Sequence, residues 1–264
     1  MGIPYYQVDA FTGDLFAGNP AGVCLLERWL PDHLLQSIAA ENNLAETAFV
    51  VRRDSRFDLR WFTPTVEMDL CGHATLAPAH VLFNHLGHPG SRVEFETRSG
   101  RLTVTREAGL LTLDFPSRPA VECPAPDDLL RGLGCRPLLA AKARDYLALL
   151  ESEQAVRELR PDMAALARLD AVGIIATAPG EECDFVSRFF APSAGVPEDP
   201  VTGSAHCTLI PFWGRRLGRS RLRARQVSRR GGELFCQDLG ERVLIAGRAV
   251  TYSSGTLHVG EGTP

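Results

Sequence analysis

Hydrophobic and polar residues alternate along several short segments of the chain, as they do in strands that bury one face. In Phe57-Asp58-Leu59-Arg60-Trp61 every second residue is apolar, and Leu222-Arg223-Ala224-Arg225 repeats the pattern. The apolar segment 43–51 predicts another strand, and Gly231-Gly232 predicts a hairpin turn that leads into residues 233–235. Several short strands are therefore expected in both halves of the chain.

Two other segments carry apolar residues at helical spacing. The stripe Leu34, Leu35, Ile38 and Ala39 follows Asp32 and predicts a helix that stops at Asn42-Asn43, because Asn tolerates the left-handed conformation. A second stripe predicts a helix from Gly72 to Gly87. Pro78 lies inside it and is expected to kink the helix or shorten its start, at a cost of ~3 kcal/mol if unrelieved.

A proline-rich stretch over 114–128 divides the chain nearly in half and is the best candidate for a linker. Each half contains Arg, two aromatics, a small residue and Pro, at 60–64 and at 188–192. In each half a Gly that opens a predicted helix follows, Gly72 in the first and Gly203 in the second. We interpret the halves as related α/β domains, 1–117 and 118–264, that face each other across a pseudo-two-fold axis. The last strand could return to the first domain.

Composition narrows the class of protein without changing this picture. The 264 residues are 45% hydrophobic and 23% charged, with 28 basic and 32 acidic side chains and a net charge of −4. These values exclude a disordered, collagen-like or disulfide-dense chain. No segment approaches the ~18 apolar residues of a membrane-spanning helix, and the N-terminus lacks the features of a signal peptide. Seven scattered cysteines fit reduced thiols in the cytoplasm.

Glu46 is the first residue whose position suggests chemistry. With a period of two it shares a strand face with Leu44, Ala48 and Val50. A carboxylate on an apolar face is costly unless it is paired or neutralised, and such surroundings turn a Glu into a general acid or base. The alternative is a strand-end Glu that faces solvent or pairs with an Arg.

The two helix starts, Gly72-His73 and Gly203-Ser204, form a second candidate site. Helix N-termini present unpaired N–H groups and a partial positive charge, so two of them brought together would bind an anion such as a substrate carboxylate. Asp199 and His73 would be polar groups at the same pocket. The alternative is a pair of ordinary Gly-containing loops before helices.

Cysteines and histidines near these helix starts raise the question of a metal. Cys71, His73, His206 and Cys207 have spacings that suit a tetrahedral zinc site poorly, so no metal is expected. Cys71 at a helix N-terminus could be a proton-shuttling or nucleophilic thiol with a lowered pKa. The alternative is a small buried residue.

Eight arginines between Arg215 and Arg230 are not interleaved with aromatic residues, so we interpret them as a solvated face and expect no nucleic-acid partner. Glycine-rich nucleotide motifs and a lysine placed for a Schiff base are both missing from the sequence, which disfavours nicotinamide, nucleotide and pyridoxal cofactors.

In chain order, a set of segments together resembles the PhzF (phenazine-biosynthesis isomerase-like) family. They are Val8-Asp9-Ala10-Phe11, Gly18-Asn19-Pro20-Ala21-Gly22-Val23, Asn43-Leu44-Ala45-Glu46-Thr47-Ala48-Phe49, Cys71-Gly72-His73-Ala74-Thr75, Glu198-Asp199-Pro200-Val201-Thr202-Gly203-Ser204-Ala205-His206, 225–232 and 247–250. The resemblance implies a diaminopimelate-epimerase-like fold: two similar α/β domains, each a sheet curled around a central helix. It also implies a site in the cleft between them, a homodimer and no cofactor.

What the family does is implied for this chain by the same motifs. Its characterised member isomerises trans-2,3-dihydro-3-hydroxyanthranilate by moving a proton. Glu46 would take and return that proton, with His73, Asp199 and Ser204 as polar partners. Gly72 and Gly203 would bind the substrate carboxylate through backbone N–H groups. The substrate-binding set would be completed by Asn19, Cys71 and Thr202.

Two alternatives stay open. The related epimerases use two cysteines, one at each helix start, whereas this chain has Cys71 at the first position and Thr202 at the second. An amino-acid racemase or epimerase that uses Cys71 would therefore lack its second thiol. The other alternative is a non-catalytic protein that binds a small carboxylate metabolite.

Overall fold

The structure, a computed structural model, describes residues 1–54 and 56–260, which form two compact units. Unit 1 comprises Met1–Asp114 and the chain from Ala246 onward, and unit 2 comprises Phe115–Ile245. Residues 115–117, expected to close the first domain, belong to unit 2, and the last strand belongs to unit 1.

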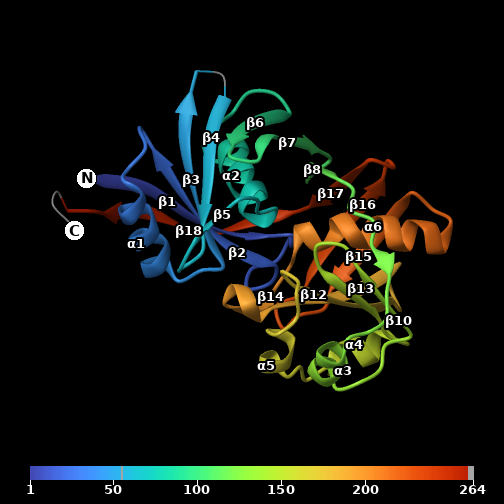
Figure 1. Cartoon of the computed structure of the whole chain (residues 1–264). Coiled ribbons are helices and arrows are strands. Elements are labelled where there is room, and N and C mark those ends of the chain that lie inside the picture. The colour runs from blue at the N-terminus through green and yellow to red at the C-terminus, as the bar shows by residue number, and fades with distance from the viewer. Residues whose placement is uncertain (55, 261–264) are drawn as a thin grey trace. The chain divides into compact units, whose positions relative to one another are not determined.

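Unit 1 consists of a mixed β-sheet, with both antiparallel and parallel strand pairs, and two helices (Figure 1). Its elements are β1 (Gly2–Ala10), β2 (Asn19–Leu26), α1 (Asp32–Asn42), β3 (Glu46–Arg53), β4 (Arg56–Phe62), β5 (Glu67–Met68), α2 (His73–Asn84), β6 (Arg92–Thr97), β7 (Gly100–Glu107), β8 (Leu110–Pro116) and β18 (Ala249–His258). Strand β1 lies antiparallel to both β18 and β2, and β2 is parallel to β3. Strand β4 is antiparallel to β3 and β5 and parallel to β6, which continues into the β6–β7–β8 meander.

Both predicted helices of unit 1 form. Helix α1 ends as expected: Asn43 adopts φ 48° and its N–H donates to the carbonyl of Ala39. Leu35 and Ile38 of this helix pack with Phe49 in a buried cluster. Helix α2 is buried around most of its circumference and contacts β1, β2, β3, β7 and β18, so it is the central helix of the unit.

Of the two effects expected of Pro78, a shortened helix start does not occur. Helix α2 continues through Pro78 from His73 to Asn84 and ends before the predicted stop at Gly87. Pro78 has no N–H for the carbonyl of Ala74, four residues earlier. The indole Nε1–H of Trp61 donates to this carbonyl instead, at 3.0 Å. The buried carbonyl therefore keeps a hydrogen bond.

Unit 2 repeats the strand order of unit 1. Its elements are β9 (Val121–Glu122), α3 (Asp127–Leu133), β10 (Leu139–Lys142), β11 (Tyr146–Leu149), α4 (Glu153–Glu158), α5 (Met163–Leu166), β12 (Ile174–Pro179), β13 (Phe185–Ala191), the 3-10 helix η1 (Pro192–Ala194), β14 (Val196–Asp199), α6 (Gly203–Leu217), β15 (Arg221–Gln226), β16 (Gly232–Asp238) and β17 (Arg242–Gly247). Strands β10 to β13 pair as β1 to β4 do. Strand β13 is then antiparallel to β14 and parallel to β15, as β4 is to β5 and β6.

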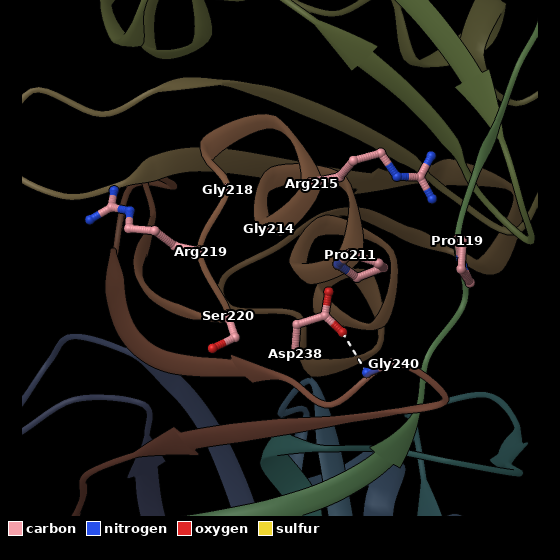
Figure 2. A pocket seen from close by; sticks show the side chains of 9 residues that line it. All are labelled: Pro119, Pro211, Gly214, Arg215, Gly218, Arg219, Ser220, Asp238 and Gly240. Atoms are coloured by element: carbon pink, nitrogen blue, oxygen red, sulfur yellow. Dashed lines mark hydrogen bonds between the residues drawn. The ribbon is translucent and has the colours of Figure 1, made fainter.

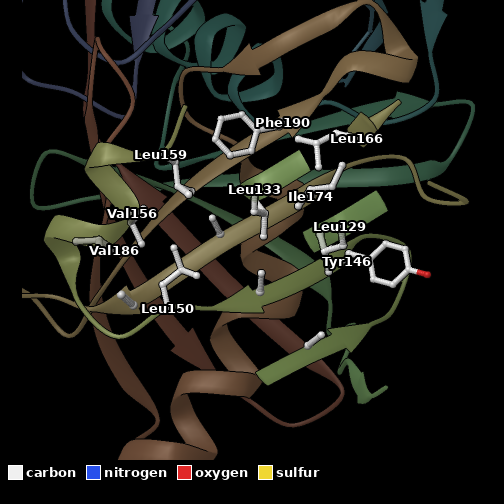
Figure 3. Packing of buried hydrophobic residues seen from close by; sticks show 14 of the residues in the cluster. Leu129, Leu133, Tyr146, Leu150, Val156, Leu159, Leu166, Ile174, Val186 and Phe190 are labelled. Atoms are coloured by element: carbon white, nitrogen blue, oxygen red, sulfur yellow. The ribbon is translucent and has the colours of Figure 1, made fainter. Parts of the chain in front are cut away.

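One face of this sheet carries a core of leucines, alanines and aromatic residues. Leu129 and Leu133 of α3, Val156 of α4 and Leu166 of α5 pack there on Ile174 and Phe190 (Figure 3). The short helices thus cover one face, and α6, buried along most of its length, is the central helix of unit 2.

The sequence repeat has a structural counterpart in each unit. The guanidinium of Arg60 donates to both oxygens of Glu67 at 2.7 and 2.8 Å, and that of Arg188 donates to both oxygens of Glu198 at 2.7 and 2.9 Å. Each pair joins the long strand to the short strand that leads to the central helix. The repeated arginine therefore sets the path into α2 and into α6.

Helix α6 also contains a proline, and its unpaired carbonyl is hydrogen-bonded by a backbone N–H instead of a side chain. Pro211 has no N–H for the carbonyl of Cys207, and the backbone N–H of Arg118 donates to that oxygen at 2.9 Å. Both central helices thus depend on a hydrogen-bond donor from outside the helix.

The arginine-rich segment lies along α6, β15 and the loop that follows. Arg219 pairs with Asp184, Arg223 with Glu233 and Arg225 with Glu182. Separately, none of the helices in the described part of the chain has the length and apolar character needed to span a membrane.

A double-mutant cycle tests the role of Trp61. Replacing Trp61 with Phe leaves the buried Ala74 carbonyl without its donor and should cost about 1–3 kcal/mol of unfolding free energy beyond the packing change. In a Pro78→Ala background the new N–H serves that carbonyl, so the same change should cost less. Urea unfolding of the four proteins measures the coupling. Equal costs in both backgrounds would show that the indole hydrogen bond carries no stability.

Candidate active site

Three of the predicted site residues surround the imidazole of a fourth, His73, in unit 1. Nε2 of His73 lies 3.0 Å from Oε2 of Glu46, and Nδ1 lies 3.0 Å from the amide nitrogen of Asn19. The sulfur of Cys71 lies 3.5 Å from Nδ1. Side-chain exposure is 3% for His73 and 13% for Glu46, so the carboxylate keeps limited access to a ligand while the ring has almost none.

Strand register and helix start bring these side chains together. Glu46 is the first residue of β3, three residues later than the predicted strand start, and it is paired with Ala21 of the neighbouring parallel strand. Asn19 opens that strand, β2, and His73 is the first residue of α2 after Gly72. The cluster thus stands where two strands and the central helix begin.

The residues around Glu46 differ in one respect from the pattern expected. Ala48 and Val50 are buried as predicted, but so are residues on the other strand face, including Phe49. Strand β3 is therefore covered on both sides. The expected alternative, a salt bridge from Glu46 to an arginine, is not the pairing observed, because the ion-pair partner of Glu46 is His73.

Electrostatics favour a protonated His73. Burial lowers its pKa, but the negative charge of the Glu46 carboxylate, 3.0 Å from Nε2, opposes this and holds the pKa of His73 well above 6.5. A protonated ring donates from Nε2 to the Glu46 carboxylate. The Asn19 amide can present its oxygen to a protonated Nδ1 or its nitrogen to an unprotonated one, so it suits both states of the ring.

The expectation of a lowered pKa for Cys71 was wrong. Burial, followed by the nearby Glu46 carboxylate, raises the pKa of this thiol to about 11. Cys71 is 6% exposed and therefore a neutral, buried thiol near neutral pH. This matches the alternative interpretation of a small buried residue.

Glu46, Cys71 and His73 also form a group that could hold a metal ion, since their ligand atoms lie within 4.8 Å of one another. The sulfur, however, is nearer Nδ1 than Nε2, at 3.5 against 4.0 Å, whereas the carboxylate lies at Nε2. The expected absence of a metal at this group stays a prediction.

The remaining predicted residues form a second cluster in unit 2. Thr202, the residue before α6, donates its hydroxyl to Oδ2 of Asp199 at 2.5 Å. Gln226 is 1% exposed and links the two residues: its oxygen accepts the N–H of Thr202 at 2.8 Å, and its nitrogen donates to the carbonyl of Asp199 at 2.7 Å. The loop that opens α6 is thus held by one buried amide.

Ser204 is the second residue of α6, directly after Gly203, and its Oγ accepts a hydrogen bond from Arg144 at 3.2 Å. His206 lies two residues further, one turn after Thr202, and is fully buried, with Nδ1 2.8 Å from the carbonyl of Thr202. Burial lowers the pKa of His206 to about 4, so the ring is neutral near neutral pH.

Two residues of this cluster were missed in the sequence. Gln226 continues the alternation of Leu222 and Ala224 and so occupies a buried position, which is an unusual place for an amide. That pattern could have identified it. Arg144 is an isolated residue of a hairpin turn, and nothing in its surroundings in the sequence points to α6.

A pocket of about 610 Å³ opens at the C-terminal end of α6 (Figure 2). Its lining includes Arg215, Arg219 and Asp238 and none of the predicted site residues. Ser204 lies ten residues before Gly214 of this pocket, about 15 Å along the helix. The pocket is therefore separate from the cluster at the start of α6.

Comparisons with known proteins agree with these observations. A family model described as "Phenazine biosynthesis-like protein" (PhzC-PhzF) matches residues 8–255. An uncharacterized isomerase of Pseudomonas aeruginosa is 55% identical over 260 residues, which cover 98% of this chain and all of the relative. The crystal structure of a phenazine biosynthesis protein of the PhzF family from Enterococcus faecalis has a TM-score of 0.96 at 46% identity, with 98% of this chain and all of that chain covered.

A more distant structure supports the fold alone. A probable proline racemase from Agrobacterium radiobacter has a TM-score of 0.64 at 11% identity, with 99% of this chain and 94% of that chain covered. Together these similarities confirm the predicted epimerase-like α/β fold.

The pairing of Glu46 with His73 predicts how the histidine titrates. Glu46→Gln removes a negative charge that raises the pKa of His73, so burial then lowers that pKa relative to wild type. Histidine ring NMR across a pH series measures the change. In wild type the pKa of His73 is higher in the folded protein than its unfolded value of ~6.5. The contribution of His73 to the free energy of unfolding is therefore complete below about pH 6.5 and is lost as pH rises through the folded pKa. An unchanged midpoint in the variant would contradict the assigned pair.

Proposed function

Because the chain belongs to the phenazine biosynthesis-like (PhzC-PhzF) family and is an isomerase, we propose that it moves a proton within a small carboxylate-bearing substrate. Glu46 takes the proton from one carbon and returns it to another, without a cofactor. The observation that carries the proposal is the contact of 3.0 Å between Glu46 and the buried His73.

The geometry suits a general base that must also act as an acid. Oε2 of Glu46 is engaged by His73, which leaves Oε1 as the oxygen that can reach a substrate proton. The limited exposure of Glu46 keeps bulk water from competing for that proton. His73 is thus a partner that orients the carboxylate and responds to the change in its charge.

The cluster in unit 2 is assigned to substrate binding. Backbone N–H groups at Gly203 and the hydroxyl of Ser204 are donors suited to a carboxylate, and Asp199 is an acceptor for an amino or hydroxyl group. That Gly72 and Gly203 serve one substrate stays a prediction, as do a homodimer and a cytoplasmic location.

A racemase that uses Cys71 is less well supported. Its thiol has a pKa of about 11, and the equivalent second position holds Thr202, whose hydroxyl donates to Asp199. A second thiol is therefore missing at that position, and Cys71 is a weak proton acceptor near neutral pH.

Turnover by variants tests the assignment of Glu46. With trans-2,3-dihydro-3-hydroxyanthranilate as substrate and proton NMR as the assay, Glu46→Gln should lower kcat by about 10²–10⁴-fold, the usual worth of a general acid or base. Glu27→Gln, the matched control, replaces an exposed carboxylate with an amide in the same way and should leave kcat unchanged. Cys71→Ser should retain most of the activity.

Two outcomes would overturn this proposal. Full activity in folded Glu46→Gln would remove its role, and a loss specific to Cys71→Ser would favour the racemase-like alternative. Binding of the compound without chemical change in wild type would favour the metabolite-binding protein.

Cofactor independence has its own test. Protein unfolded in guanidinium with EDTA, desalted and refolded should regain the kcat of untreated protein, because every proposed catalytic group belongs to the chain. Recovery only after addition of a metal ion or a cell-extract filtrate would contradict this prediction.

A further inference from the structure

The turn between β10 and β11 places a guanidinium at the start of α6. Nη2 of Arg144 donates to Oγ of Ser204 at 3.2 Å. Ser204 belongs to the proposed binding cluster, whereas Arg144 lies sixty residues earlier in a different element. This contact brings a fixed positive charge to a helix end that already favours anions.

Arg144 is held by its neighbour Asp145, which is 1% exposed. The Asp145 carboxylate forms an ion pair with Arg144, with Oδ1 3.5 Å from Nε. The backbone N–H of Ala143 donates to the carbonyl of Asp145 at 3.1 Å, which closes the turn. The arginine thus leaves a turn that is tied to the sheet, with about a third of its side chain exposed.

Further charged groups lie near this contact. Burial raises the pKa of the Asp145 carboxyl, and the positive charges of Arg144 and Arg118 oppose that rise. Asp199 adds a second carboxylate before the helix, and its Oδ2 accepts the hydroxyl of Thr202. The donors of Arg144, rather than an excess of positive charge, are therefore what this corner offers a carboxylate.

Hydrogen-bond directions show what Arg144 and Ser204 offer a ligand. A guanidinium has five N–H donors, and Ser204 with Asp145 engages only some of them. Because Oγ of Ser204 accepts from Arg144, its own hydrogen is directed to another acceptor. Both groups can then donate to the same carboxylate, and paired donors of this kind give selectivity for that group.

We propose that Arg144 binds the substrate carboxylate together with Ser204 and makes the enzyme selective for carboxylates over neutral analogues. This proposal for Arg144 rests on the proposed function in one respect: it requires a substrate that carries a carboxylate. Arg144 is a specificity-determining residue in this role, and it has no part in moving the proton.

The test compares two stable probes, anthranilate and its neutral amide, anthranilamide, by calorimetry. Wild type should bind anthranilate more tightly than anthranilamide. Arg144→Ala should weaken anthranilate roughly ten- to hundredfold, the scale of a hydrogen bond to a charged group, and leave anthranilamide nearly unchanged. Arg144→Lys should keep part of the preference, since it retains the charge but not the planar donors.

Controls separate this inference from the proposed mechanism. Arg136→Ala removes an equal charge from an exposed position of unit 2 and should leave both affinities unchanged. Glu46→Gln should lose turnover yet keep the preference for anthranilate, so failure of the mechanism and failure of the binding role give different results. Equal weakening of both probes by Arg144→Ala, an unchanged preference, or a wild type without the preference would overturn the proposal.

Discussion

The contact between Glu46 and His73 is the interaction on which the site depends. Two titratable groups of low exposure lie 3.0 Å apart, and neither could be buried alone without losing its charge or a large amount of free energy. Their positions follow from the parallel pairing of β2 with β3 and from the start of α2 at His73. A shift of one residue in that register would turn the carboxylate to the other strand face.

The central helices meet a second constraint. Each contains a buried proline and therefore a carbonyl that its own helix cannot serve. Trp61 supplies the missing donor for α2, and the backbone of Arg118 supplies it for α6. In both units the hydrogen bond ties the helix to a segment outside it, so the helix start that carries the candidate site residues is fixed by tertiary contacts. Local helix propensity alone would not hold it there.

Much of this architecture could be predicted from the sequence because periodicity and turn residues act locally. The helix stop at Asn43, the strands around Leu59 and Ala224, and the two helix starts near Gly72 and Gly203 all formed close to where they were expected. Family motifs, rather than spacing, identified Glu46 and His73 as partners. The helix, strand and motif patterns together were therefore sufficient to predict the fold and most residues of the candidate site.

The rest depends on contacts between distant segments. Pro78 cannot donate to the carbonyl of Ala74, and the indole of Trp61 supplies the missing hydrogen bond. The contact of Arg144 with Ser204 joins residues sixty positions apart in the sequence. The pKa of Cys71 followed burial rather than the helix terminus, because the low exposure of the thiol outweighs the partial charge of the helix. None of these outcomes is encoded in a short window of sequence.

The central claim is that one carboxylate both takes and returns the proton. The most direct measurement follows a substrate deuterated at the migrating position through a single turnover in ordinary water, with mass spectrometry of the product. If Glu46 carries the proton in a site with little access to water, part of the deuterium should appear at the new carbon. Complete loss of the label to water in every turnover would contradict a single carrier.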